Sequence, residues 1–350
     1  MDEIGFLVEL VSIPSPSSAE EAVAAYLLEQ MDALGFAVRQ DRAGNVLGSI
    51  GPTGAAREIV LLGHMDTVPS QLPVKQDGPY LYGRGAVDAK GPLAAFVVGA
   101  ARVANRLEES RVTVIGAVEE EDPQGRGAHH LIETYPAPDC VLVGEPSAWE
   151  GITLGYKGLM SLDYRWVQPG AHSAGREIGP AEKAITFWNH LIDYAEARNE
   201  NRWGRFDTLD PALRDFHTFD QGADKGVEMN VVMRLPPGLD PDALKGRMES
   251  WAAGADLSDA GYEPCYRSEK NTPPVRALLC AIRAEGGRPR FKLKTGTSDM
   301  NVVSRAWTCP MVAYGPGDSA LDHTPEEHID LREYRHAINV LTRALLSLAS

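Results

Sequence analysis

The sequence predicts an α/β fold in which a smaller α+β domain interrupts a larger domain with a mostly parallel sheet. Three observations lead to this prediction. Strand and helix patterns alternate over about the first 150 residues, a β-α-β-β-α-β order follows, and the α/β pattern returns near the C-terminus. A chain of 350 residues is long enough for two ordinary domains.

The first domain is expected to combine helices with strands that are covered on both faces. The stretch "SSAEEAVAAYLLEQMDALG" predicts a helix with a capping box at Ser17 and Glu20 and a C-cap at Gly35. The runs "EIVLLGH", "RVTVIGAVEE" and "PDCVLVGEP" are apolar at nearly every position, which is typical of buried parallel strands. Between the first two runs, "GPLAAFVVGAARVANRL" predicts an apolar helix with Pro92 near its start.

The inserted domain is expected to span residues 155–268, which leaves residues 1–154 and 269–350 for the first domain. The run "GLMSLDYRWV" alternates apolar and polar residues, as a half-exposed strand does. Then come a helix ("GPAEKAITFWNHLIDYAEAR"), a short run ("DFHTFDQG"), a strand ("GVEMNVVMRLP"), a helix ("DPDALKGRMESWAAG") and a strand ("GYEPCYRSE"). This order predicts a ferredoxin-like domain.

The composition is that of a globular protein, and the net charge argues against some classes of binding partner. Lys and Arg number 34 and Asp and Glu 49, giving a formal net charge of −15 at pH 7. A negative surface repels nucleic acid and anionic membranes, so neither is expected as the main partner. No apolar run approaches the roughly 20 residues that cross a bilayer. The four cysteines are scattered and form no C-x-x-C pair, so a reducing cytoplasm is the expected compartment.

Histidines and acidic residues gather where elements of the first domain end. Most follow apolar strand runs, and one lies in the glycine-rich loop "YGRGAVDAKGP" before a helix. In open α/β sheets the ligand crevice lies at the carboxyl ends of the strands, so we expect these side chains to share one crevice. They are His64, Asp66, Asp88, Glu119, Glu120, Glu121, Glu145 and His323.

Each of these residues has an ordinary explanation when it is taken alone. A His-x-Asp pair is common in loops, Asp88 could cap a helix, and His323 could be a turn residue. Their coincidence favours a metal site, because several carboxylates in one crevice repel one another unless a cation neutralises them. Imidazole and carboxylate ligands suit zinc, with each ligand about 2.0–2.2 Å from the ion. Asp66 is placed to accept the other ring N–H of His64.

The chain resembles the di-zinc aminoacylase and carboxypeptidase family, which includes acetylornithine deacetylases, succinyl-diaminopimelate desuccinylases and glutamate carboxypeptidases. The motifs that carry the resemblance are "GHMDTVP", "YGRGAVDAKGPLAAF", "AVEEED…GRGA", "VGEPS", "PGAHSAG" and "HTPEEHI", in the family's order and over most of the chain. The resemblance implies a zinc-peptidase-like catalytic domain, an inserted lid that forms a homodimer, and two Zn²⁺ ions with Co²⁺ as a substitute.

The resemblance also implies roles for individual residues. Asp88 would bridge the two ions, Glu120 would be the general base, and Asp66 would orient a ligand. His172, in "PGAHSAG", resembles the histidine that reaches a neighbouring subunit's site to bind the oxyanion. The family usually has Asp-Glu-Glu at the strand end, where this chain has three glutamates, so a one-residue slip would make Glu119 the base. The implied metal ligands are His64, Asp88, Glu121, Glu145 and His323.

Two features bear on the substrate. In "GGRPRFKLKTGTSDMN", basic residues at every second position from Arg288 to Lys294, with Lys292 among them, would lie on one face of a strand. This strip could bind an acidic partner or protect an edge strand. The strip leads into "TGTSD", which resembles the family's substrate-binding loop and contains Thr297 and Ser298. Arg234 resembles the arginine that binds a substrate carboxylate, for which bidentate geometry is apt.

The whole pattern looks closest to a branch of the family that acts in lysine and arginine biosynthesis. The enzymes of that branch cut a γ-glutamyl amide at the C-terminus of a small acidic amino-group carrier protein and release lysine or ornithine. A deacylase of small N-acyl amino acids, such as acetylornithine, acetyl-lysine or acetylcitrulline, shares the same metal residues and is the alternative. A catalytically inactive binding protein is less favoured, because every ligand and the base are present.

Overall fold

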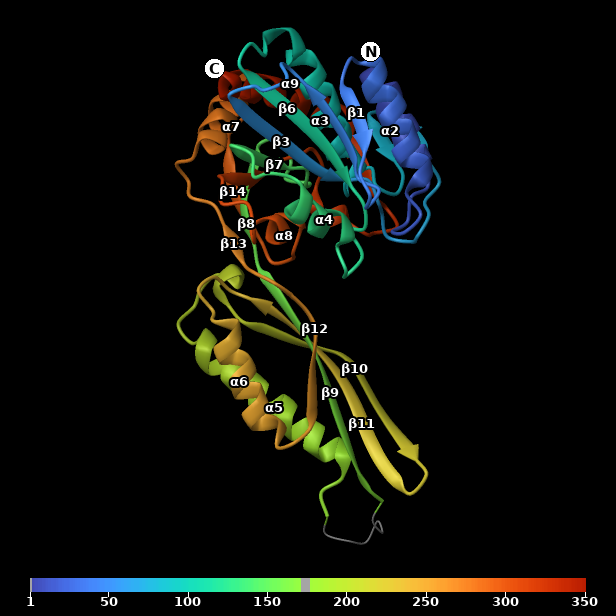
Figure 1. The fold of residues 1–350 in the computed structure, drawn as a ribbon, viewed down its shortest axis with the longest axis vertical. Helices are drawn as coiled ribbons and strands as arrows, with labels where there is room; N and C mark the ends of the chain where they lie inside the picture. The colour runs from blue at the N-terminus through green and yellow to red at the C-terminus, as the bar shows by residue number, and fades with distance from the viewer. Residues whose placement is uncertain (1, 171–176) are drawn as a thin grey trace. The chain divides into compact units, whose positions relative to one another are not determined.

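The computed structural model describes residues 2–170 and 177–350, and it divides into two compact units (Figure 1). The first unit contains residues 1–155, 267–293 and 298–350, and the second contains residues 156–266 and 294–297. These boundaries differ by one or two residues from those expected at 154/155 and 268/269. The segment 294–297, expected in the first domain, belongs to the second unit.

The first unit is built from a central sheet, a small sheet and helices. Its helices are α1 (Glu3–Ser12), α2 (Glu21–Ala33), α3 (Lys90–Val103), α4 (Arg126–Thr134), α7 (Pro273–Ala284), α8 (Asp299–Val303) and α9 (Leu331–Ala349). Its strands, which include three that reach the boundary with the second unit, are β1 (Ala37–Gln40), β2 (Val46–Ile50), β3 (Arg57–His64), β4 (Lys75–Asp77), β5 (Tyr80–Tyr82), β6 (Ser110–Ala117), β7 (Cys140–Val143), β8 (Gly151–Tyr156), β13 (Tyr266–Arg267), β14 (Arg290–Lys294), β15 (Met311–Ala313) and β16 (His328–Asp330).

The central sheet has a parallel core with antiparallel neighbours. Its strand order is β1-β2-β6-β3-β7-β15-β8-β13, with β14 paired to β8. Strand β3 runs parallel to β6 and β7, and β15 runs parallel to β7, whereas β2 and β8 join this core in the antiparallel sense. The predicted fold class is therefore confirmed. The parallel strands carry their C-terminal ends to one edge, where His64 of β3 pairs with Ala117 of β6.

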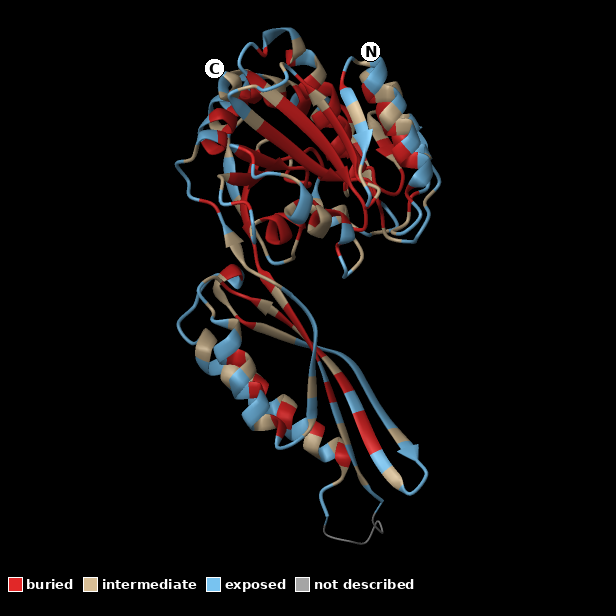
Figure 2. Cartoon of the chain, viewed as in Figure 1, coloured by how far each residue is buried: buried red, intermediate tan, exposed pale blue. Residues whose placement is uncertain are grey.

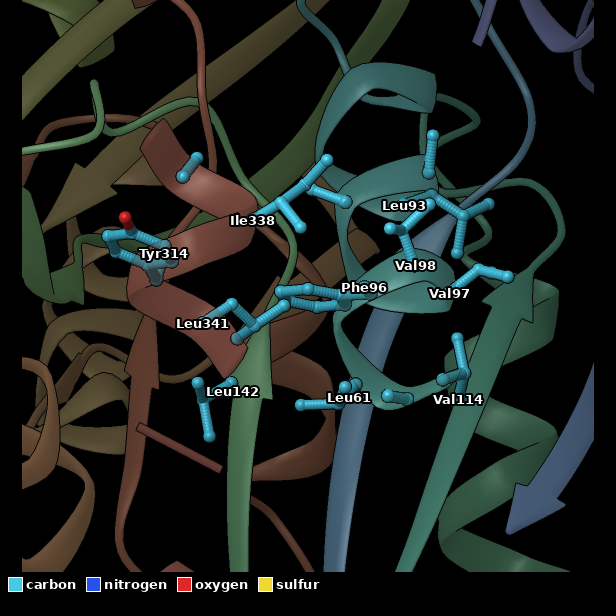
Figure 3. Packing of buried hydrophobic residues seen from close by; sticks show 14 of the residues in the cluster. Leu61, Leu93, Phe96, Val97, Val98, Val114, Leu142, Tyr314, Ile338 and Leu341 are labelled. Atoms are coloured by element: carbon cyan, nitrogen blue, oxygen red, sulfur yellow. The ribbon is translucent and has the colours of Figure 1, made fainter. Parts of the chain in front are cut away.

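The core of the first unit lies between the sheet and the helices α1, α2, α3, α7 and α9. Figure 2 shows the central strands as almost continuously buried. Figure 3 shows Phe96 of α3 beside Leu341 of α9, with Leu61 of β3 and Leu142 of β7 contributing to the same cluster. Leu61 and Leu142 come from the apolar runs that predicted doubly covered strands.

Two glycines allow α3 to approach the strand ends that carry candidate ligands. A Cβ at Gly63 would lie 3.3 Å from Leu93, and a Cβ at Gly144 would lie 3.0 Å from Phe96. Gly63 directly precedes His64, and Gly144 directly precedes Glu145. The close approach of a helix therefore explains why a glycine stands immediately before each of these two polar residues.

The second unit has a four-stranded antiparallel sheet with two helices. Its elements are β9 (Gly158–Pro169), α5 (Pro180–Asn199), β10 (Asp210–Gln221), β11 (Asp224–Leu235), α6 (Pro241–Ala252) and β12 (Asp256–Glu263). The strand order is β10-β11-β9-β12, as the β-α-β-β-α-β pattern predicts. A separate cluster, which includes Leu162, Phe187 and Met229, packs the helices on one face of the sheet.

The short run "DFHTFDQG", the third element of the expected β-α-β-β-α-β order, falls almost entirely within the 12-residue strand β10, which pairs with β11. One local expectation is wrong. The capping box expected at Ser17 is absent: α2 begins at Glu21, and the hydroxyl of Ser17 donates to Oδ2 of Asp66 at 2.8 Å. Helices long and apolar enough to cross a membrane do not occur in residues 2–170 and 177–350.

Candidate metal centre

The structure brings the predicted ligands to the C-terminal edge of the parallel strands. His64 is the last residue of β3, Glu121 follows β6 by four positions, and Glu145 follows β7 by two. Asp88 lies in the loop before α3, and His323 lies in the connection between β15 and β16. Four separate loops and one strand end therefore supply the site, at the carboxyl ends of the strands where open α/β sheets place their ligand crevice.

Asp88 lies between the two histidines, one on each carboxylate oxygen. Its Oδ1 is 3.3 Å from Nε2 of His64, and its Oδ2 is 3.2 Å from Nε2 of His323. Nε2 of His323 is also 2.7 Å from Oε1 of Glu121. Ligand atoms of His64, Asp88 and Glu121 all lie within 4.8 Å of one another. This spacing suits a carboxylate that bridges two cations, each with its own histidine.

The charges around the site favour the binding of cations. Burial raises the pKa of the Glu120 carboxyl well above its usual range, and the neighbouring carboxylates of Glu145, Asp299 and Glu121 add to this rise against the opposing effect of His64. Glu145 and Asp299 are both buried. Such a concentration of acids is costly unless a cation compensates it. The imidazole and carboxylate donors fit zinc and related divalent ions.

In the metal-free protein, neighbouring carboxylates favour the protonated form of both candidate histidine ligands. Burial opposes a charge on His64, but its bonds to Asp66 and Asp88 prevail and hold its pKa well above the usual value. The carboxylates of Asp88 and Glu121 raise the pKa of His323 to about 10. A metal ion needs the neutral imidazole, so it must displace these protons when it binds.

Asp66 holds two parts of the site together. Its carboxylate faces Nδ1 of His64 at 3.3 Å, which leaves Nε2 directed toward Asp88. The same carboxylate accepts the backbone N–H groups of Glu120 and Glu121, each at 3.0 Å. Asp66 itself is fully buried. These contacts suit the role expected for Asp66 in orienting His64, and they also hold the turn that carries the acidic run.

The three successive glutamates have different environments. The carboxylate of Glu119 accepts hydrogen bonds from Arg126 and Ser18, each at 2.8 Å, and the Arg126 guanidinium lowers its pKa. Its φ of +56° places it in the left-handed region, where a non-glycine residue costs about 1–3 kcal/mol. The Glu120 carboxyl instead interacts through charge with His64 and with the other acids of the site. This difference favours Glu120 over Glu119 as the residue free to transfer a proton.

The segment of residues 13–20 contacts the site in a way that the sequence did not indicate. Ser15 donates to the carbonyl of Met65 at 2.7 Å, and Ser17 donates to Asp66. In the sequence, these serines look like a helix-capping signal. No local pattern distinguishes a serine that caps a helix from one that bonds to a residue almost fifty positions away. Asp299, in the stretch "TGTSD", is a further acidic neighbour of Glu120 that the sequence pattern does not indicate.

The predicted substrate-binding residues have separate positions. In the second unit, Nη1 of Arg234 donates to Oγ1 of Thr297 at 3.1 Å, and burial together with the nearby Arg214 lowers the pKa of Arg234. In the first unit, Ser298 is buried, and its hydroxyl caps α8 by accepting the N–H of Met300 at 3.3 Å. The hydroxyl of Ser298 is therefore already used within the protein.

The basic strip falls on β14, where Lys292 and Lys294 are half-buried and Arg290 is exposed. Leu293, on the opposite side of the strand, packs against the main core, as the alternation predicts. Arg288 lies before the strand begins. His172 lies outside the residues that the structure describes.

Comparison with known proteins gives relatives that match along nearly the whole chain. The [LysW]-lysine hydrolase of Deinococcus radiodurans is 43% identical over 347 residues, which is 97% of this chain and 95% of the relative. A Pyrococcus furiosus protein, provisionally named [LysW]-lysine/[LysW]-ornithine hydrolase, is 38% identical over 351 residues, which is 100% of this chain and 98% of the relative.

A solved structure and a family profile agree with these relatives. The metallo-carboxypeptidase Sso-CP2 of Sulfolobus solfataricus, described as a member of the M20 family, has a TM-score of 0.81 at 18% identity, covering 100% of this chain and 99% of that one. At this identity the likeness shows the fold alone. The profile of peptidase family M20/M25/M40 matches residues 60–347. The chain therefore belongs to peptidase family M20/M25/M40.

Proposed function

We propose that this chain is a metal-dependent amide hydrolase that releases lysine, ornithine or both from an acidic amino-group carrier protein. The bond cut is the amide to the γ-carboxyl of the carrier's C-terminal glutamate. The chemistry rests on one observation, the position of the Asp88 carboxylate between His64 and His323. The choice of substrate is supported by the 43% identity to a [LysW]-lysine hydrolase over 97% of the chain.

The proposed ligands divide into two sets around Asp88. His64 and Glu145 would hold one ion, His323 and Glu121 the other, and Asp88 would bridge them. Two divalent ions, zinc in our proposal with cobalt as a substitute, would supply the positive charge that polarises the amide carbonyl. His64, Asp88 and Glu121 have ligand atoms within 4.8 Å of one another, which supports this assignment.

Glu120 is the proposed general base. It takes a proton from the attacking water and delivers it to the leaving nitrogen, because the amine must leave protonated. Its raised pKa, caused by burial and the neighbouring acids, suits a group that accepts a proton and then returns it. Glu119 is less suited, since Arg126 already pairs with its carboxylate at 2.8 Å. Asp66 orients His64 and the Glu120–Glu121 turn.

The proposed substrate contacts follow from charge. Arg234 binds a substrate carboxylate, with Thr297 holding its guanidinium at 3.1 Å and Ser298 shaping the same loop. Lys292 and Lys294 on β14 attract the acidic carrier, which a chain of net charge −15 would otherwise repel. Attraction of opposite charges raises the rate of encounter more than it raises affinity at equilibrium.

We also propose that the protein forms a homodimer through the second unit. In this dimer, His172 of each subunit would contribute an oxyanion-binding group to the partner's site. Strand β10 lies at the edge of its sheet and exposes Leu213 and Phe216, which supports an interface there. The proposed compartment is the cytoplasm, in keeping with four cysteines that form no disulfide with one another.

A turnover assay tests the proposal directly. The purified enzyme is given the carrier conjugates of lysine and of ornithine, with acetyl-lysine and acetylornithine as comparison substrates, in the presence and absence of a chelator. We expect hydrolysis of at least one carrier conjugate, loss of that activity with chelator, and recovery on addition of Zn²⁺ or Co²⁺. Faster turnover of the acetylated amino acids than of both conjugates would contradict the proposed substrate.

A further inference from the structure

A buried ion pair joins the two loops that bear Asp88 and His323. Nη1 of Arg84 lies 2.6 Å from Oε2 of Glu327, and these residues are separated by 243 positions in the chain. Glu327 is 1% exposed and Arg84 is 8% exposed. Removal of one partner from such a pair leaves an uncompensated buried charge, so the two residues act as one unit.

Each member of the pair fixes the backbone of a ligand-bearing loop. Oε1 of Glu327 accepts the N–H of Val87 at 2.9 Å and the N–H of Asp88 itself at 3.1 Å. Nη2 of Arg84 donates to the carbonyl of Thr324, the residue after His323, at 3.2 Å. Hydrogen bonds between an ionised group and backbone amides are short and strong, so they define the position of the loop closely.

We infer that Arg84 and Glu327 are positioning residues of the metal centre, which set the separation between Asp88 and His323. Neither side chain is assigned as a ligand, and both act through the backbone of residues that are. The inference rests on the metal centre of the proposed function. It explains why the bridging carboxylate can meet a histidine from a distant loop at 3.2 Å.

The chain offers a matched control in Glu333. Its Oε1 also accepts two backbone N–H groups, those of Trp149 and Gly317, each at 3.0 Å. Burial raises the pKa of both the Glu327 and the Glu333 carboxyls. Glu333→Gln therefore removes a similar charge from a similar backbone site, but at residues that are not next to a proposed ligand.

The test measures metal binding rather than turnover. The full-length parent, Glu327→Gln and Glu333→Gln are stripped with a chelator, and each is titrated with Zn²⁺ in competition with a chromophoric chelator. We expect Glu327→Gln to weaken Zn²⁺ binding about 10–100-fold, the usual effect of losing a group that orients a metal ligand, and Glu333→Gln to leave it within about twofold. The visible absorption of the Co²⁺-loaded protein should change only in Glu327→Gln.

Binding of Zn²⁺ by Glu327→Gln within about twofold of the parent, with an unchanged Co²⁺ spectrum, would overturn the inference. A parent chain that binds neither metal would instead contradict the metal centre itself, and the inference with it. Arg84→Lys provides a second variant if Glu327→Gln does not fold. A single ammonium cannot reach Glu327, Thr324 and the carbonyl of Ser70 together, so this variant should also weaken Zn²⁺ binding, and unchanged binding would again count against the inference.

Discussion

Oδ1 of Asp66 accepts the backbone N–H of Glu120 at 3.0 Å, so the carboxylate beside His64 also holds the proposed base in place. Replacing Asp66 with Asn keeps the shape of the side chain but exchanges one carboxylate oxygen for an NH₂ donor. The remaining oxygen cannot accept the backbone N–H groups of both Glu120 and Glu121 in the same way. We expect Asp66→Asn to lower Zn²⁺ affinity and kcat by about 10–100-fold each.

Asp41→Asn is the control for that substitution. Oδ1 of Asp41 accepts three backbone N–H groups, those of Ala43, Gly44 and Asn45, at 2.9–3.0 Å, and the residue lies in the turn between β1 and β2. Its replacement should lower the melting temperature without a comparable loss of Zn²⁺ affinity. Equal losses of affinity in the two variants would show that Asp66 stabilises the fold and does not orient the site.

Glu120→Gln and Glu119→Gln should separate the two candidate bases. The first removes the group that transfers the proton, so kcat should fall by about 10²–10⁴ while bound Zn²⁺ is retained. The second breaks the ion pair with Arg126, which is half exposed, and should change kcat much less. The measurement is steady-state turnover of the lysine conjugate with metal content determined on the same samples. A larger fall in Glu119→Gln would reverse the assignment.

Metal binding should release protons at pH 7.5. Neighbouring carboxylates raise the pKa of both His64 and His323, the latter to about 10, so both imidazoles are protonated before the metal binds. About two protons per chain should therefore be released when both sites fill. Calorimetric titration with Zn²⁺ in buffers of different ionisation enthalpy measures this number, and release of none would contradict the proposed ligands.

The same pKa values predict how pH affects the metal-free protein. A histidine whose pKa is raised by folding stabilises the folded state fully below its ordinary value of 6.5, and this stabilisation is lost as the pH rises through about 10. The melting temperature of the chelator-treated protein should therefore decline between neutral pH and pH 10 by more than that of His323→Gln. A decline of equal size in the two proteins would contradict the assignment to His323.

Charge reversal on β14 should distinguish a protein substrate from a small one. The double variant Lys292→Glu/Lys294→Glu places negative charge where the acidic carrier is proposed to approach. We expect kcat/KM for the carrier conjugate to fall at least about tenfold at low salt, with less effect at high salt, while acetyl-lysine turnover changes little. Lys225→Glu, on β11, is the control. An equal loss on both substrates would indicate damage to the site itself.

The parallel core and the order of the inserted domain could be predicted because their signals are local. A doubly covered strand such as β3 needs an apolar residue at nearly every position, and this is visible in a window of eight residues. The proposed ligands could be predicted for a similar reason. His64, Asp88, Glu121 and Glu145 lie at or near the ends of strands or helices that the periodicity reveals, and the topology of such a sheet brings those ends together. His323 lies ten positions after β15, and its proposed role comes from the family resemblance.

The supporting contacts could not be predicted, because each joins segments distant in the chain. Ser17 and Glu20 have the spacing of a capping box, yet the hydroxyl of Ser17 bonds to Asp66. Glu327 stands in "PEEHI", where consecutive glutamates are typical of a solvated surface, but it is 1% exposed and paired with Arg84. Only the folded chain shows which hydroxyls and carboxylates are used between loops.

Diffraction data collected at the zinc absorption edge from crystals of the Zn²⁺-loaded protein would test the central claim most directly. The account predicts two anomalous peaks about 3.5–4 Å apart on either side of the Asp88 carboxylate. One should lie beside His64 and Glu145, and the other beside His323 and Glu121. A fully loaded crystal with no peak at Asp88, or with a single peak that touches neither histidine, would contradict it.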